Sequence, residues 1–167
     1  MTKKTSTHLQ TRRQAIAAGA LDVLAEQGTH KLTHRSVDRH LGLPQGSTSY
    51  YFNSREALLM AAADALAQAD TQDVLALGDA SDLSPLLALW TAPPARTRLL
   101  ARLELFLEAA RNPAFQAHMA QHRALFRHLG EAVMARRGEP NPQAAADEAI
   151  AHFEGQLLRV TVFGSDG

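Results

Sequence analysis

Hydrophobic residues recur along most of the chain at the three- and four-residue steps of an α-helix. After a polar, basic arm, Ile16, Ala20, Val23 and Leu24 keep this spacing, and Gly28 is a typical helix stop. The pattern therefore predicts a first helix that ends at Gly28 and turns one apolar face toward a core.

Two short helices are predicted in residues 33–52. Thr33 is a suitable N-cap for the first of them, and Val37 and Leu41, four residues apart, are expected to face inward. The segment Gly42-Leu43-Pro44 breaks the chain. Because proline is tolerated in a first helical turn, Pro44 is expected to open the second short helix.

The rest of the chain predicts a bundle of helices. Asn53 and Glu56 have the spacing of a capping box, which predicts that a long helix begins there. Prolines at 85, 93, 94, 113, 140 and 142 mark the later breaks. The apolar stripes in residues 115–133 and 146–160 alternate steps of three and four, which is typical of near-parallel helix packing. No further helix is expected in the short segment that follows residue 161.

Composition supports an all-α fold. The sequence has 31 Ala and 24 Leu but only 6 Val and 2 Ile, and sheets favour the β-branched residues that are scarce here. The net charge of 0 hides an asymmetry, since residues 1–56 hold 8 basic and 4 acidic side chains and residues 57–167 hold 9 and 13. A basic head suggests a polyanionic partner, although such a segment is more often only a solvated surface.

Several classes of protein are excluded. The chain has no cysteine, so disulfides, thiolate metal sites and cysteine nucleophiles are ruled out. The longest apolar run, residues 57–63, is seven residues long, far short of the roughly 20 that a membrane-spanning helix needs. The first ten residues lack the apolar stretch of a secretory signal. We therefore expect a cytoplasmic protein with no membrane partner.

Residues 33–52 carry the strongest functional signal, because two short helices joined by a glycine-containing turn have the size of a helix-turn-helix. In that motif the second helix enters the DNA major groove, which favours small, hydrogen-bonding side chains. On the second helix, Gln45, Ser47, Thr48 and Ser49 are such residues, and Gly46 allows close approach of the backbone. On the first helix, Thr33, His34, Arg35 and Arg39 can contact phosphates or base edges. Arg55 adds a positive group at the start of the long helix. On these residues alone, an ordinary helical hairpin is an equally good interpretation.

The residues Leu32-Thr33, Gly42-Leu43, Gly46, Tyr50-Tyr51-Phe52 and 53–59 resemble the DNA-binding domain of the tetracycline-repressor (TetR) family. The resemblance covers residues 12 to about 60, and the spacing from Gly28 to Thr33 agrees with it. It implies a helix-turn-helix head in residues 1–56 and a helical ligand-binding and dimerisation body in residues 57–167. It also implies that Thr33, Arg35, Tyr51 and Arg55 contact the DNA backbone, and that Gln45, Ser47, Thr48 and Tyr50 face the bases.

The sequence departs from the family pattern at several positions of this motif. Asp38 stands where a small alanine is common, and Pro44 where a serine often caps the helix. Thr48 replaces a bulky aliphatic residue, and Ser49 replaces a tyrosine. These departures affect the individual base contacts more than the way the motif docks on DNA. Phe52 is expected to be core, and at least one of the two tyrosines to contact DNA.

The body resembles the family in architecture rather than in a motif. Members dimerise through their last two long helices, which implies a homodimer interface at Leu129, Val133, Ile150, Phe153, Leu157 and Val160, although packing within one chain would give the same stripes. Members often enclose a small-molecule pocket as well. Its candidate lining residues are Met60, Leu66, Trp90, Leu103, Phe106, Phe115, Met119, His122 and Phe126, each of which could equally be core.

Metal and catalytic chemistry have weak support. His118 and His122 are four residues apart, a spacing able to chelate a metal, and Glu148 and His152 repeat it, but no third ligand is evident. We therefore predict no metal, no cofactor and no catalytic residue.

The sequence as a whole predicts a DNA-binding regulator, most simply a repressor that a small-molecule effector releases from a palindromic operator. Two alternatives stay open: a helical ligand carrier or enzyme that has kept a helix-turn-helix-like hairpin, and a regulator without an effector that a protein partner controls.

Overall fold

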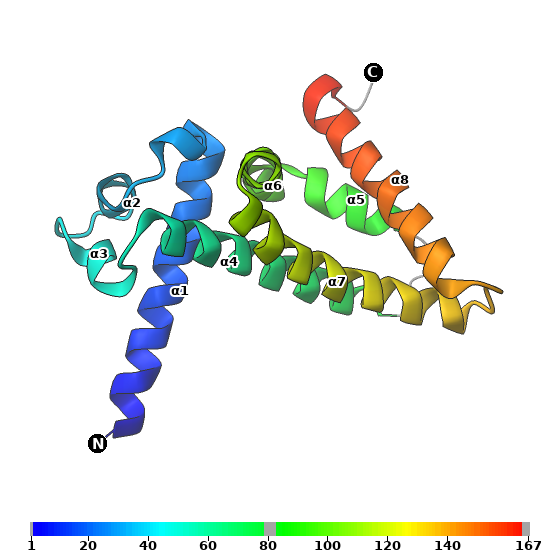
Figure 1. Ribbon diagram of the computed structural model, residues 1–167, viewed down its shortest axis with the longest axis horizontal. Helices are drawn as coiled ribbons and strands as arrows, with labels where there is room; N and C mark the ends of the chain where they lie inside the picture. Colours follow the sequence, from blue (N-terminus) through cyan, green and yellow to red (C-terminus); the bar gives the residue numbers. More distant parts are fainter. Residues whose placement is uncertain (1, 79–82, 165–167) are drawn as a thin grey trace.

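The computed structural model describes residues 2–78 and 83–164, and within these residues every regular element is helical (Figure 1). The elements are α1 (Thr2–Gln27), the 3₁₀ turn η1 (Thr29–Lys31), α2 (His34–His40), α3 (Ser47–Tyr51), α4 (Arg55–Ala76), α5 (Ser84–Thr91), α6 (Pro93–Arg111), α7 (Pro113–Arg136) and α8 (Pro142–Phe163). The predicted all-α fold is confirmed. Residues 165–167, where no further helix was expected, lie outside the described residues.

The helices form an elongated molecule with different elements at its two ends (Figure 1). The short helices α2 and α3 lie at one end beside α1, and α8 lies at the other end with α5. The long helices α4 and α7 run between the two ends. A change in the position of α4 can therefore be transmitted directly to the end that carries α2 and α3.

Two hydrophobic cores hold these elements together. The first joins α1, α2 and α4 through residues such as Ile16, Leu24, Val37 and Leu58, and it also takes in Leu105 of α6. The second lies between α5, α6 and α8 and consists of Leu86, Trp90, Leu99, Phe153 and Leu157. Because the first core includes side chains from α6 and α7, the head formed by α1–α3 is packed firmly onto the body.

The start of α2 agrees with the sequence prediction. Thr33 is the N-cap, and its hydroxyl accepts a hydrogen bond from the Ser36 N–H at 3.0 Å. The Ser36 hydroxyl accepts one in return from the Thr33 N–H at 2.9 Å. This reciprocal capping box satisfies two amides at the helix start, so the N-terminus of α2 is held in place.

The start of α3 differs from the prediction. The helix begins at Ser47 rather than at Pro44, because the Pro44 carbonyl accepts hydrogen bonds from the Ser47 amide and hydroxyl and so closes a turn ahead of the helix. Gly46 lies within this turn, as the N-cap of α3, with φ of 94°, a left-handed conformation that favours glycine.

The starts of α1 and α4 differ as well. The polar segment at the beginning of the chain continues α1, which starts at Thr2. The N-cap of α4 is Ser54, whose hydroxyl accepts a hydrogen bond from the Ala57 N–H at 3.0 Å. The capping box expected from Asn53 and Glu56 is therefore wrong by one residue.

Among residues 2–78 and 83–164, none of the helices combines the length and the apolar character needed to cross a bilayer.

Candidate functional site

The outer surface of α2, α3 and the turn between them is polar and basic. Six of the residues predicted to contact DNA are exposed there: Thr33, Arg35, Gln45, Gly46, Ser49 and Tyr50. Tyr50 is 79% exposed although it is a large aromatic residue, so packing does not account for its position. His34, Ser47 and Tyr51 are half-buried.

Asp38 fastens α3 to α2. One of its carboxylate oxygens accepts hydrogen bonds from the Thr48 hydroxyl at 2.6 Å and the Thr48 N–H at 2.8 Å, and the other accepts one from the Gly46 N–H at 2.8 Å. Amides in the first turn of a helix have no partner within the helix, so the carboxylate serves as a cap for α3. Two of the four departures from the family pattern, Asp38 and Thr48, are therefore hydrogen-bonding partners.

Thr48 cannot contact a base. Its side chain is completely buried, and its hydroxyl is committed to Asp38. The prediction that Thr48 faces the DNA is therefore wrong, because the inward face of a short helix packed on α2 was taken for its outward face.

The environment of Asp38 shifts its pKa. Burial raises the pKa of the carboxyl, but the hydrogen bonds from Thr48 and Gly46, together with the nearby His34, lower it by more. The pKa of Asp38 therefore lies below its ordinary value of 3.8, and the group is ionised at neutral pH.

Arg13 and His34 hold the other end of α3. A guanidinium nitrogen of Arg13 donates to the Tyr51 carbonyl at 2.5 Å, and the guanidinium lies 4.5 Å from the centre of the Phe52 ring. His34 Nε2 donates to the Phe52 carbonyl at 2.7 Å. Sequence analysis missed Arg13, because its partners are 38 and 39 residues away. Its place in the polar, basic stretch before Ile16 was the only signal.

Arg55 joins the head to the body. Its guanidinium donates to the Thr29 carbonyl at 2.7 Å and lies 3.9 Å from the Glu108 carboxylate. The Thr29 N–H donates to the Glu104 carboxylate at 2.9 Å, so α6 also binds the 3₁₀ turn η1. The Arg55 side chain is still 36% exposed, so its contact with phosphate stays a prediction.

A cavity of about 490 Å³ lies in the body between α4, α6, α7 and α8. Six of the nine predicted lining residues do line it: Leu66, Trp90, Phe106, Met119, His122 and Phe126. The other three were predicted wrongly. Phe115 and Met60 belong to the first core, and Leu103 lies on α6 outside the cavity wall.

The cavity wall holds a charged pair that sequence analysis missed. Arg102 donates to both carboxylate oxygens of Asp70, at 2.7 and 2.8 Å, and its guanidinium lies 4.2 Å from the centre of the Trp90 ring. Arg102 Nε is buried and has no hydrogen-bond partner within the described part of the chain. Asp70 and Arg102 are far apart in sequence, so no local pattern could have revealed the pair.

Two family models match the chain. The model of the bacterial regulatory proteins of the tetR family matches residues 16–62, and the tetracyclin repressor-like C-terminal domain matches residues 53–167. The chain belongs to the TetR family. The resemblance inferred from residues 32–59 is thereby confirmed, and membership of a family of transcription regulators agrees with the prediction that the chain is not an enzyme.

Curated TetR-family relatives are repressors by name. The HTH-type transcriptional repressor Rv1474c of Mycobacterium tuberculosis is 30% identical over 125 residues, which cover 74% of this chain and 65% of the relative. The HTH-type transcriptional repressor AcnR of Corynebacterium diphtheriae is 30% identical over 132 residues, which cover 78% of this chain and 66% of the relative. The chain thus spans just under two thirds of the length of these relatives.

Several solved structures share the fold of this chain. The family member SCO1917 from Streptomyces coelicolor A3 is 28% identical with a TM-score of 0.74, covering 92% of this chain and 89% of that one. The multidrug binding protein EbrR, solved with ethidium, is 26% identical with a TM-score of 0.73, covering 92% of this chain and 90% of that one. A regulator from Rhodococcus sp. is 21% identical with a TM-score of 0.79, and the match covers 92% of this chain and 89% of that one. At this identity the similarity shows the fold alone.

In this TetR-family chain, half of the predicted dimer residues face the interior of their own subunit. Ile150, Phe153 and Leu157 are 5%, 2% and 3% exposed, and the last two line the cavity. Their assignment to a subunit interface is wrong, because the apolar stripe of α8 packs against α5 and α7 of the same chain. Leu129, Val133 and Val160, the other three, are half-buried.

Proposed function

We propose that the chain is a transcriptional repressor that binds an operator as a symmetric dimer and is released by a small molecule in the central cavity. One observation carries the DNA-binding part: Asp38 locks α3 onto α2 while the polar and basic side chains of both helices stay exposed. The names of the relatives support repression. In this proposal residues 1–56 bind DNA, residues 57–167 form the body, and the protein acts in the cytoplasm, where the operator lies.

The exposed residues divide into two roles. Gln45, Ser49 and Tyr50 lie on α3 or the turn before it, where a helix in the major groove presents its side chains to base edges. Arg35 lies on α2, which crosses the phosphate backbone in this motif, and Thr33 is the N-cap of that helix. Base contacts set the sequence preference, whereas phosphate contacts set the affinity and its dependence on salt.

The exposed face of α8 is the proposed dimer surface. Ala151, Gly155, Leu158 and Val162 recur at steps of four and three and are all exposed, and Leu158 and Val162 are 50% and 57% exposed. A second copy that covers this apolar stripe would remove it from water. Dimerisation also doubles the number of base contacts, since one α3 reaches only one half-site.

The cavity has the size and lining of a small-molecule site. Its charged residues are paired, Asp70 with Arg102 and Glu154 with Arg123 at 2.6 Å, so the wall offers a ligand no uncompensated charge. We expect a mainly apolar organic molecule, because aliphatic and aromatic side chains make up most of the wall. The structural similarity to EbrR, which was solved with ethidium, supports an organic ligand of this size.

Helix α4 links the cavity to the head. It contributes Leu66, Ala67 and Asp70 to the cavity wall, and it starts at Arg55 shortly after α3 ends at Tyr51. A ligand that fits only one position of α4 would shift the spacing of the two heads of a dimer, so that they no longer match successive grooves. Release then depends on the difference in ligand affinity between the two states.

Selection of bound fragments from the host genome by the purified protein is the test. The fragment recovered should bind with an affinity that falls steeply between 50 and 200 mM salt, and no enrichment of any fragment would refute the proposal. Thermal shifts with a panel of apolar organic dyes, including ethidium, test the effector part, because a ligand that prefers the folded state raises its stability. A panel without effect on stability or on DNA binding would favour a regulator that a protein partner controls.

A further inference from the structure

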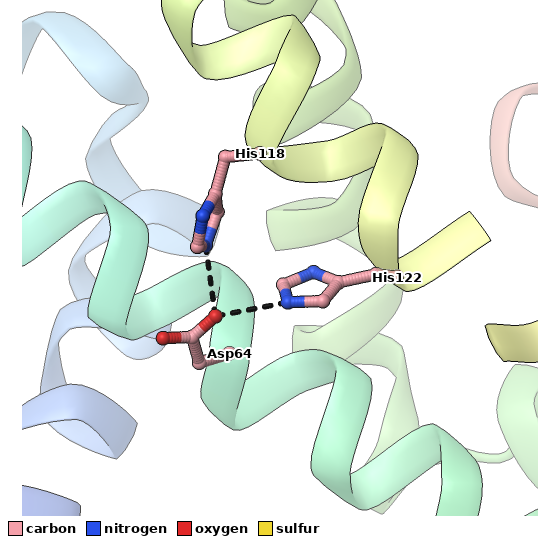
Figure 2. A group of neighbouring side chains, drawn as sticks. All are labelled: Asp64, His118 and His122. Carbon is pink, nitrogen blue, oxygen red and sulfur yellow. Dashed lines mark hydrogen bonds and ion pairs between the residues drawn. The ribbon is translucent and has the colours of Figure 1, made fainter. Parts of the chain in front are cut away.

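Two histidines of α7 and an aspartate of α4 converge on one point (Figure 2). His118 and His122, one helical turn apart, point from α7 toward Asp64, and their Nε2 atoms lie 2.8 and 2.9 Å from the same carboxylate oxygen. The ligand atoms of all three residues lie within 4.8 Å of one another. The sequence predicted no metal because the histidine pair lacked a third ligand, and Asp64 is in the position of that ligand.

We propose that Asp64, His118 and His122 bind a divalent transition metal ion, with Zn²⁺ as the best match. Two imidazole nitrogens and one carboxylate oxygen are a common Zn²⁺ donor set, and three protein ligands leave the fourth tetrahedral position for water. Zn²⁺ bonds of about 2.0–2.1 Å place neighbouring ligand atoms roughly 3.3 Å apart. Each Nε2 atom, now 2.8 or 2.9 Å from the shared Asp64 oxygen, therefore needs to move only about half an ångström away from that oxygen to admit the ion.

The surroundings of the cluster suit an ion. His118 and His122 are half-buried, with side chains 21% and 23% exposed, while Asp64 is 57% exposed and leaves a path for a hydrated cation. The Phe115 ring stacks on His118 at 6.3 Å, and the two imidazoles meet edge to face at 4.9 Å, so the rings are held in orientation. His122 faces Asp64 through Nε2, the nitrogen that would bind the ion, while its Nδ1 has no hydrogen-bond partner within the described residues.

The same chain contains a matched control. Glu148 and His152 on α8 have the same four-residue spacing as His118 and His122, but both are exposed. Within the part of the chain that the structure describes, the cluster around Asp64 is the only group of three such residues close enough to share an ion. If spacing alone bound the metal, both pairs would do so, whereas the structure favours only the pair on α7.

The test is Zn²⁺ binding to the full chain after treatment with a chelator, measured by competition with a chromophoric chelator. We expect one Zn²⁺ per chain for the wild type and for H152A. The loss of outer-shell partners costs 10–100-fold in affinity, so H118A, H122A and D64N, which lose direct ligands, should bind at least about 100-fold more weakly. D64N keeps the shape of an exposed side chain, so its folding should match the wild type in circular dichroism.

Two outcomes would overturn the proposal. One is a wild type that binds Zn²⁺ no more tightly than D64N, in which case the cluster is only a set of hydrogen bonds between α4 and α7. The other is an H152A variant that loses as much Zn²⁺ affinity as H118A, H122A and D64N. Thermal unfolding gives a second readout, because Zn²⁺ should raise the melting temperature of the wild type but not that of D64N. Co²⁺ bound in the same place should show the visible absorption of a four-coordinate ion.

An ion in this place would fasten α4 to α7. Since α4 also links the cavity to the head, Zn²⁺ would restrain the movement on which release from DNA depends, a consequence that rests on the proposed function. Metal binding itself does not rest on it. A chain that binds Zn²⁺ but no operator would refute only the proposed function, and a chain that binds an operator but no Zn²⁺ would refute only the metal site.

Discussion

Replacement of Asp38 by alanine tests whether this carboxylate holds α3 in place for DNA binding. D38A removes the acceptor of three hydrogen bonds and leaves the Thr48 N–H and hydroxyl, which are completely buried, without a partner. The Gly46 N–H, in contrast, belongs to an exposed residue and can turn to water. The cost therefore comes mainly from the two donors of Thr48.

The magnitude follows from these two hydrogen bonds. A hydrogen bond to a charged group contributes roughly 1.5–3 kcal/mol, and relief from burying the carboxylate offsets part of the loss. We expect D38A to lower the free energy of unfolding by about 3 kcal/mol. For a chain of this length each kcal/mol corresponds to about 2–4 °C, so the melting temperature should fall by roughly 6–12 °C. DNA binding should weaken as well, because α3 is no longer held in one orientation.

The loss should depend on pH in a defined direction. Because the folded pKa of Asp38 lies below its ordinary value of 3.8, the ionised group stabilises the fold above that value. This stabilisation is lost as the pH falls through the lower folded pKa. The difference in unfolding free energy between the wild type and D38A should therefore be constant near neutral pH and narrow below about pH 4.

Urea unfolding followed by circular dichroism measures the difference in unfolding free energy between the wild type and D38A. All variants are compared at one protein concentration, because the stability of a dimer depends on protein concentration. D22A is the control, since Asp22 is 45% exposed and its one ion pair within the described residues is with His40 at 3.3 Å, a surface pair worth about 0–1 kcal/mol. A loss in D38A below about 1 kcal/mol, or equal to that in D22A, would refute the capping role of Asp38. A difference in unfolding free energy between the wild type and D38A that increases as the pH falls would also refute it.

Three further predictions concern the DNA surface, the cavity and the dimer. R35A should weaken binding to all DNA sequences alike and reduce the slope of log affinity against log salt concentration by about 1. Q45A, in contrast, should change the base preference, and fluorescence anisotropy with operator variants distinguishes the two effects. A Q45A variant that lost affinity equally for all sequences would contradict the role of Gln45 in base contacts. A67F should fill the cavity from α4, abolishing thermal shifts with organic dyes while operator binding persists, and A114F on the exposed side of α7 should leave both intact. V162E should convert the dimer to a monomer of 18.1 kDa in light scattering, whereas L75E, at a similarly exposed position of α4, should leave the dimer intact. A V162E variant that is still a dimer would show that this face of α8 is not the interface.

The cap of α2 and the motif in residues 32–59 could be predicted from the sequence because both depend on neighbouring residues. Thr33 and Ser36 are three apart, so their reciprocal hydrogen bonds follow from helix geometry alone. The position of Gly46 is equally local, since the left-handed turn it forms lies between two short helices. The predicted cap of α4 was wrong by one residue because Asn53 and Ser54 are both suitable N-cap residues, and Ser54 is the one used.

The faces of the helices were predicted less well, because periodicity shows that a stripe is apolar but not what covers it. Ile150, Phe153 and Leu157 have the spacing of a subunit interface, yet they are covered by helices of their own chain. Phe115 looks like a cavity residue, yet it completes the core that joins head and body. Thr48 has the small polar side chain that suits a DNA groove, yet it is turned inward to Asp38.

By itself, then, the sequence determined the helical class, the family and the position of the helix-turn-helix motif, since these depend on residue type and on spacings of a few residues. Only the tertiary structure decided which partners meet across helices: Asp38 with Thr48, Asp70 with Arg102, and Asp64 with His118 and His122. Such pairs join residues up to 58 positions apart, as from Asp64 to His122. Their contacts depend on the angles and distances at which whole helices pack, and no local pattern encodes those.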